Sequence, residues 1–225
     1  MRAQQHHVYG RREGVGYLAL IGALVLVLNV VNTSGEYLFG RYIVSAATSL
    51  YGSGPESAAA REQFIGQTYS SFFSYVNLLG LLLQMFVVSR VFKYLGVARA
   101  LMIHPLVALV GYIGMLRAPS FEFIRWLKIL DNSLDYSLGN TTKQVLWLPT
   151  SREAKYKAKQ AVDAFCVRAG DVLQAVVVYT GELASFTIPT FAALNVVFVL
   201  GWLAVVRGLH QRLHARADAT GQAEM

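Results

Sequence analysis

The chain has 225 residues, of which 55% are hydrophobic and 15% charged, and its mean hydropathy is +0.42. An ordinary soluble domain has about 25% charged residues, so this composition indicates a polytopic membrane protein rather than a soluble one. The net charge of +7 is spread over alternate hydrophilic stretches, which is typical of topology signals and argues against nucleic-acid binding. The single cysteine, Cys166, excludes a disulfide framework.

The apolar runs predict an all-α membrane protein with six transmembrane helices, each near the ~20 residues that cross a bilayer. We expect spans at residues 16–39, 64–88, 97–116, 120–148, 161–180 and 186–206. This divides the chain into an N-terminal segment (1–15), a transmembrane domain (16–206) and a C-terminal tail (207–225), which we expect to fray. Between the first two spans, the Gly, Ser and Pro content of residues 45–62 predicts a loop.

The first three spans carry few charges. Asn29, Asn32 and Glu36 share one face of the first helix, where they either make helix–helix contacts or line a cavity. The second helix has a polar stripe that should face protein or water rather than lipid: Gln67, Ser70, Ser74, Asn77 and Gln84. A basic turn around Gly96 leads into the third helix, where we interpret His104 as a packed or interfacial residue rather than a proton relay.

The stretch from 128 to 171 holds most of the charge that falls inside apolar segments. In the fourth helix, polar residues recur every three to four positions: Glu122, Arg125, Lys128, Asn132, Asp135, Gly139 and Thr142. This helix either lies on the membrane surface or spans it with its polar face toward a cavity, and its length favours the second. Along the fifth helix Gln160, Asp163, Asp171 and Gln174 share one side, with Arg168 at its edge. Asp163 also suits a gate or helix cap beside the loop lysines.

Basic residues lie in alternate hydrophilic stretches, which predicts that both termini are cytoplasmic. These residues are Arg2, Arg11 and Arg12; Arg90, Lys93 and Arg99; Arg152, Lys155, Lys157 and Lys159; and Arg207, Arg212 and Arg216.

The sequence of residues 137–174 resembles the ATP:ADP antiporter (nucleotide translocase) family of the major facilitator superfamily. A Thr-Lys-Gln segment precedes a Pro-ended helix, and a Lys-x-Lys-x-Ala-x-Asp element opens the next. These positions are Thr142, Lys143, Gln144, Pro149, Lys157, Lys159, Ala161 and Asp163. The resemblance implies a major-facilitator-like half bundle matching the C-terminal six helices. It also implies a second six-helix half or a homodimer, and location in a cell inner membrane.

We therefore expect a secondary carrier, or half of one, that exchanges an anionic solute such as ATP and ADP by alternating access. The polar faces of the first, second, fourth and fifth helices should converge near the bilayer midplane. The predicted substrate-binding residues are Asn32, Glu36, Lys128, Asp135, Lys143, Asp163, Arg168 and Asp171. We expect no cofactor, no metal site and no enzymatic activity. The alternative is a membrane scaffold that keeps the fold without transport. The six-span length supports this alternative, as does Asp171, which stands where the family has a lysine.

Overall fold

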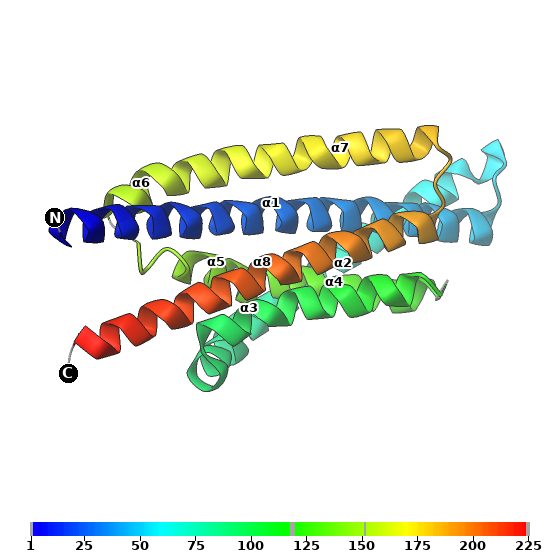
Figure 1. The fold of residues 1–225 in the computed structure, drawn as a ribbon. Helices are drawn as coiled ribbons and strands as arrows, with labels where there is room; N and C mark the ends of the chain where they lie inside the picture. Colours follow the sequence, from blue (N-terminus) through cyan, green and yellow to red (C-terminus); the bar gives the residue numbers. More distant parts are fainter. Residues whose placement is uncertain (1, 118–119, 151, 224–225) are drawn as a thin grey trace.

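The computed structural model describes residues 2–117, 120–150 and 152–223, and the side chains of 15–117, 120–150 and 155–213. All regular elements of these residues are helices (Figure 1). In chain order they are α1 (Arg2–Tyr51), η1 (Pro55–Ser57), α2 (Ala58–Leu82), η2 (Leu83–Val87), α3 (Val88–Met115), α4 (Phe121–Leu134), η3 (Asp135–Gly139), α5 (Asn140–Val145), α6 (Arg152–Ala161), η4 (Val162–Cys166), α7 (Val167–Leu183) and α8 (Ile188–Ala223).

Three of these elements are π-helical turns inside longer helices. η2, η3 and η4 join α2 to α3, α4 to α5 and α6 to α7, and the residues at each junction keep right-handed helical angles. The predicted fourth and fifth helices are therefore continuous rods whose middles are locally widened. Such π-turns are rare and are frequent at functional sites.

The helix ends follow from local chemistry. Gly96 has φ 73° and ψ 168° and divides α3 into two arms, in agreement with the predicted turn. The Ser120 side chain caps α4 by accepting a hydrogen bond from the Phe123 amide. After Val145, turns at Leu146–Thr150 lead past Pro149 into α6.

Two predicted boundaries were wrong. α1 continues through Tyr51 because residues 45–51 contain no Gly or Pro, and it ends only where Gly52 takes a φ of 82°. The loop is thus much shorter than residues 45–62. At the other end, α8 continues to Ala223, so the backbone of the tail is helical where fraying was expected.

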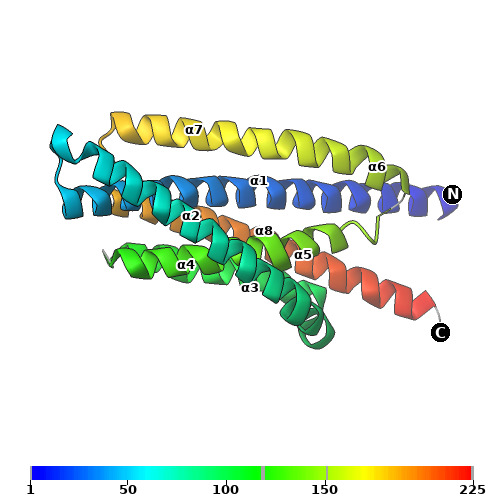
Figure 2. The same cartoon turned by 180° about the vertical axis from the view of Figure 1, so that it is seen from behind.

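α1 is the central helix. It packs against α8, α7, α2 and α4 (Figures 1 and 2). Its fully buried side chains include Tyr17, Ile21, Leu38 and Ile43. α2 lies against α4 and α1, while α3 packs against α8, as seen from behind in Figure 2. The core is one continuous apolar cluster around α1, with a smaller cluster between α3 and η3.

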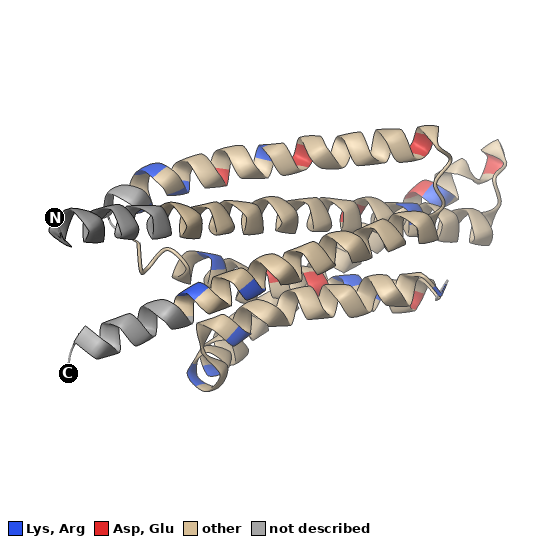
Figure 3. Cartoon of the chain, viewed as in Figure 1, with Lys and Arg blue, Asp and Glu red and all other residues tan. Residues whose placement is uncertain are grey.

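Both termini lie at the same end of the bundle (Figure 1). Lys and Arg residues on α6, on the turn within α3 and on the second half of α8 lie toward that end (Figure 3). The described basic residues of these stretches thus lie toward one end of the bundle, and the side of the membrane that this end faces stays a prediction. We call this the terminal end of the bundle.

Three stretches of the described residues are long and apolar enough to cross a membrane: Val15–Tyr51, Pro55–Met115 and Ile188–Leu213. The second includes both predicted spans on either side of Gly96. Large apolar side chains on the outside of α2, α7 and α8, such as Leu78, Val176 and Val197, are exposed. An apolar outer surface of this kind is expected of a protein embedded in lipid.

Candidate anion cavity and buried charge network

A cavity of about 230 Å³ opens between α1, α5 and the helix formed by α6, η4 and α7. We call it the lysine cavity. It is lined by Ile21, Leu24, Val25, Asn140, Lys143, Gln144, Leu146, Trp147, Lys159, Asp163 and Val167. The α1 residues give it an apolar wall, whereas the fourth and fifth helices supply its polar groups.

The wall formed by the fourth helix is held firmly against α1. The Tyr17 hydroxyl donates to the carbonyl of Leu146 over 2.8 Å, and Trp147 is buried at the same turn. Thr150 then donates to the carbonyl of Trp147 at 2.6 Å. These contacts fix the end of α5, and with it the position of Lys143, relative to α1.

The opposite wall carries one cation and one anion. Lys159 lies in the last turn of α6, and Asp163 lies four residues later in η4, so both share a helix face. With Lys143 the cavity holds two cations and one carboxylate, together with the amides Asn140 and Gln144. Two ammonium groups beside an apolar wall favour an anionic ligand that also has an apolar part.

Deeper in the bundle, the fourth helix carries a buried ion pair. The Lys128 side chain is 2% exposed, and its ammonium lies 2.9 Å from Asp131 and 3.5 Å from the Asn32 amide oxygen. His104 Nε2 on α3 lies 3.2 Å from the other oxygen of Asp131. One buried ammonium and a histidine thus share the Asp131 carboxylate, which satisfies groups whose isolated burial would be costly.

Small residues make room for this network. A Cβ on Gly35 would lie 2.9 Å from the Lys128 ammonium and 2.5 Å from the Tyr112 hydroxyl, which donates to the carbonyl of Val31. Glycine at this point of α1 therefore allows the fourth helix to bring its charge against the central helix.

A second ion pair connects this network with the lysine cavity. Asp135, in η3, is buried and lies 3.5 Å from the Lys143 ammonium. Lys143 in turn lines the cavity. We call the set Lys128, Asp131, His104, Asp135 and Lys143 the charge network. It follows one side of the fourth helix from its buried middle to the cavity.

The predicted site residues fall in several places. Lys143 and Asp163 line the lysine cavity, whereas Lys128, Asp135 and Asn32 belong to the buried region around the charge network. In the structure, the fourth and fifth helices line one cavity together. The substrate-binding role of these five residues remains a prediction.

The other three predicted residues lie elsewhere. Asp171 accepts a hydrogen bond of 2.7 Å from Asn29, which ties α7 to α1, and the Arg168 side chain beside it is 84% exposed. Glu36 lies in a separate open cavity of about 620 Å³ with Tyr37 and Arg41. Among the described residues, the predicted polar groups of the four helices therefore line separate cavities and contacts.

Sequence reasoning left three functional candidates out of the predicted site. Asp131 shares the carboxylate centre of the network, His104 contacts it from α3, and Lys159 faces Lys143 across the cavity. Lys159 and Asp131 could have been found, because they stand four and three residues from the predicted Asp163 and Lys128. The contact between His104 and Asp131 depends on how α3 packs against α4, which spacing does not reveal.

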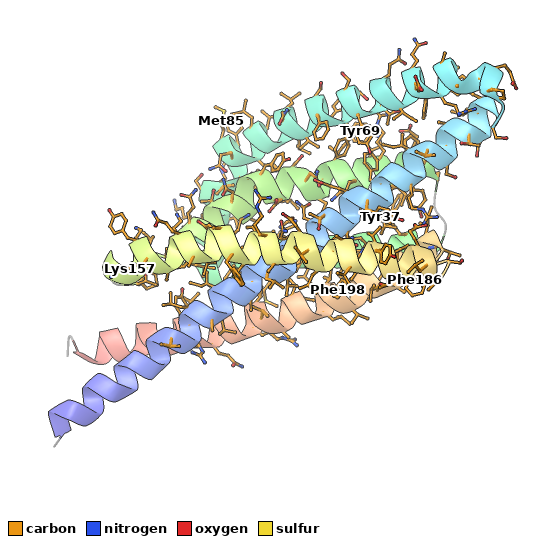
Figure 4. All side chains as sticks on the ribbon, turned by 90° about the horizontal axis from the view of Figure 1, so that it is seen from above. Tyr37, Tyr69, Met85, Lys157, Phe186 and Phe198 are labelled. Atoms are coloured by element: carbon orange, nitrogen blue, oxygen red, sulfur yellow. The ribbon has the colours of Figure 1, made fainter. Side chains whose placement is uncertain are left out.

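The end of the bundle opposite to the terminal end is closed by another polar contact. Arg41 of α1 lies 3.0 Å from Glu182 of α7, and the Tyr37 hydroxyl also donates to Glu182. Figure 4 shows Tyr37 and Phe186 together at this end and Lys157 at the other. α1 and α7 are therefore joined at this end by Arg41 and Glu182 and farther along by Asn29 and Asp171, and the lysine cavity lies beside them toward the terminal end.

Comparison with known proteins places the similarity on this same region. Residues 125–213 match the family model described as TLC ATP/ADP transporter. The chain is 28% identical over 127 residues to ADP,ATP carrier protein 1, chloroplastic, of Arabidopsis thaliana, covering 54% of this chain and 20% of that protein. No solved structure matches the chain. The segment that carries Lys128, Lys143, Lys159 and Asp163 is thus similar to the TLC ATP/ADP transporter family.

Proposed function

We propose that the chain is a membrane carrier, or part of one, that exchanges a nucleotide such as ATP or ADP and binds its phosphates in the lysine cavity. One observation carries this proposal. The cavity is lined by Lys143 and Lys159, and both lie within the residues that match the transporter family model. Two ammonium groups across an open cavity suit a polyphosphate, and the apolar wall on α1 suits a base or ribose edge.

The proposal treats all six predicted helices as spans of a major-facilitator-like half. The fourth and fifth helices are too charged to count as spans by composition alone. Several of these charges, however, lie in the lysine cavity or in buried pairs, which is how membrane helices accommodate ionisable residues, whereas the Arg168 side chain is 84% exposed. With the basic residues at the terminal end, both termini would be cytoplasmic, and the carrier would lie in a cell inner membrane.

A second half would complete the carrier. Along α2, the polar stripe Gln67, Ser70, Ser74 and Asn77 is exposed. Polar side chains at the depth of the bilayer do not face lipid. We infer that this face of α2 lies against a water-filled pathway or a further set of helices, either a second copy of the chain or another six-helix half.

Exchange in reconstituted vesicles tests the proposal. Labelled ATP should enter vesicles that contain ADP, and Lys143→Gln and Lys159→Gln should each lower uptake by at least about tenfold, as expected for loss of a charge-assisted contact of 1.5–3 kcal/mol. Lys93→Gln, which removes an exposed lysine of α3 beside Tyr94, should leave uptake unchanged. If another anion is moved and ATP is not, the nucleotide is wrong and the carrier stands.

The scaffold alternative makes a different prediction in the same assay. The pairs Lys128–Asp131 and Lys143–Asp135 are contacts that a scaffold would also contain. The open lysine cavity favours the carrier, because a purely structural bundle gains nothing from two lysines facing one cavity. A scaffold would move no solute in any vesicle, and the lysine substitutions would then change stability alone.

A further inference from the structure

His104 is a buried histidine with one of its ring nitrogens engaged. Nε2 lies 3.2 Å from Asp131, while Nδ1 is buried and has no hydrogen-bond partner among the described residues. The ring is held edge-on by Trp202 of α8, with centroids 4.8 Å apart. A purely packed histidine in an apolar core would be expected to satisfy both nitrogens or to be replaced by an apolar side chain.

The charge balance around the imidazole ring allows it to accept one more proton. Lys128 and Asp131 neutralise each other, so the neutral imidazole donates its Nε2–H to Asp131 and keeps a lone pair on Nδ1. Adding a proton to that lone pair gives an imidazolium and breaks no covalent bond. The Asp131 carboxylate is then shared between two cations.

A second carboxylate faces Nδ1. A Cβ on Gly139 would lie 3.3 Å from His104 Nδ1 and 3.0 Å from the nearer oxygen of Asp135. Because Gly139 has no side chain, His104 Nδ1 and the Asp135 oxygen both lie close to the position that a Cβ would take. The imidazolium would find Asp131 on one side and Asp135 on the other.

The remaining neighbours of the ring include one charged group, Lys143. A small cavity beside it is lined by Leu24 and Leu28 of α1 and by Trp202 of α8, which are uncharged, and by Thr142 and Lys143 of the fourth helix. Its volume is about 20 Å³, which is enough for one water. Lys143 and Leu24 also line the lysine cavity, so the two cavities share part of their lining.

Lys143 connects the ring to the anion. In the structure its ammonium lies 3.5 Å from Asp135 and neutralises that carboxylate. An anion bound in the lysine cavity attracts Lys143, and Asp135 then loses part of its counter-charge. Protonated His104 restores that counter-charge, so each binding event favours the other, and the coupling is reciprocal.

We propose that His104 is a proton-binding site whose protonation is linked, through Asp135 and Lys143, to anion binding in the lysine cavity. The proposal rests on the anion-binding role proposed above for that cavity. Its consequence is that this carrier binds its anion together with a proton, so its affinity for the anion falls as the pH rises.

Calorimetry on the full chain in lipid nanodiscs tests this, with ADP as the probe. Titrations in two buffers of different ionisation heat, at several pH values from 6 to 8.5, give the number of protons taken up per ADP bound. ADP itself ionises in this range, so the decisive quantity is the difference between the wild type and His104→Gln. His210→Gln is the matched control, because His210 is a histidine of α8 that lies outside the charge network.

The expected result is that the wild type and His210→Gln take up a fraction of a proton, up to one, more than His104→Gln does. Over the same range the wild-type affinity for ADP should fall by up to about tenfold per pH unit relative to His104→Gln. Asp135→Asn keeps the histidine and should also abolish the extra uptake, which provides a second variant if His104→Gln does not fold.

The outcomes separate the two proposals. ADP binding with the same proton number in the wild type, His104→Gln and Asp135→Asn would overturn the proton site and leave the anion cavity intact. A folded, monodisperse chain that binds no ADP at any pH would overturn both.

Discussion

A lysine whose side chain is 2% exposed needs a partner for its ammonium group. Lys128 has Asp131 at 2.9 Å, and Asn32 lies at 3.5 Å on the other side. Burying an ion pair costs desolvation that its mutual attraction barely offsets, but removing one partner leaves an uncompensated charge that costs about 3–5 kcal/mol. Lys128 and Asp131 should therefore behave as a unit in stability measurements.

Lys128→Met is expected to lower the free energy of unfolding by about 3–5 kcal/mol, because it leaves the Asp131 carboxylate with His104 alone. Lys128→Met combined with Asp131→Asn should recover most of that loss, since no unpaired charge then remains. Denaturant unfolding in mild detergent measures both, with Lys93→Met as an exposed control. Equal loss in the single and double variants would contradict the paired role.

At the residue scale, the sequence pattern predicted which charged residues lie inside the bundle more reliably than it predicted their contacts. Lys143 and Asp163 line one cavity, and both stood out because ionisable residues inside apolar segments are uncommon. Arg168 was equally prominent in sequence, yet its side chain is 84% exposed in this chain. The outcome depends on which face of α7 packs against α1, and Asn29 contacting Asp171 and Val167 decides that face.

At the scale of the element, the turn inside α3 depends on one backbone conformation. Gly96 has φ 73° and ψ 168°, a region that is accessible almost only to glycine. Helical residues on both sides would otherwise continue one rod, and the third helix would not fold back along α8. The apolar pattern located this turn because Gly96 lies among basic residues between two apolar runs.

Gly96→Ala should therefore destabilise the bundle by about 1–3 kcal/mol through backbone strain, although nothing lies within 4 Å of its Cβ. Gly66→Ala is the matched control. Its Cβ would also meet nothing within 4 Å, but Gly66 lies inside α2, where alanine should stabilise by roughly 0.5–1 kcal/mol. The midpoint of thermal unfolding in detergent compares the two. A shift of the same sign for both variants would show that the turn is not strained as described.

The three π-turns could not be predicted from the sequence. η3 and η4 carry Asp135 and Asp163, yet hydrophobic periodicity near 3.6 residues cannot distinguish one widened turn from a regular one. The same limit explains the misplaced end of α1. Residues 45–51 suit a helix or a loop equally well, and only the glycine at position 52 ends the helix.

At the scale of the whole molecule, the charge distribution predicts that the two ends of the bundle face opposite sides of the membrane. Basic segments lie toward the terminal end (Figure 3), and Arg41 and Glu182 join α1 to α7 at the other. The lysine cavity lies on the side of α6. With cytoplasmic termini, this cavity would open toward the cytoplasm.

Cysteine accessibility tests this orientation. In a Cys166→Ser background, Ser53→Cys lies in the turn after α1 and Lys157→Cys lies on α6, and both positions are exposed. A membrane-impermeant maleimide added to intact cells should label the first, and should label the second only after lysis, because basic segments stay cytoplasmic. Labelling of both in intact cells would refute the topology.

We propose that a nucleotide binds between α1, α5 and the α6–η4 helix. Photo-labelling of that site is the direct test. The purified chain in nanodiscs is irradiated with 8-azido-ATP, and the modified peptides are identified by mass spectrometry. We expect modification within residues 17–28, 138–148 or 159–167, suppressed by excess ADP and lost in Lys143→Gln combined with Lys159→Gln, while Lys93→Gln keeps it. Modification confined to other segments, or unaffected by ADP, would contradict the account.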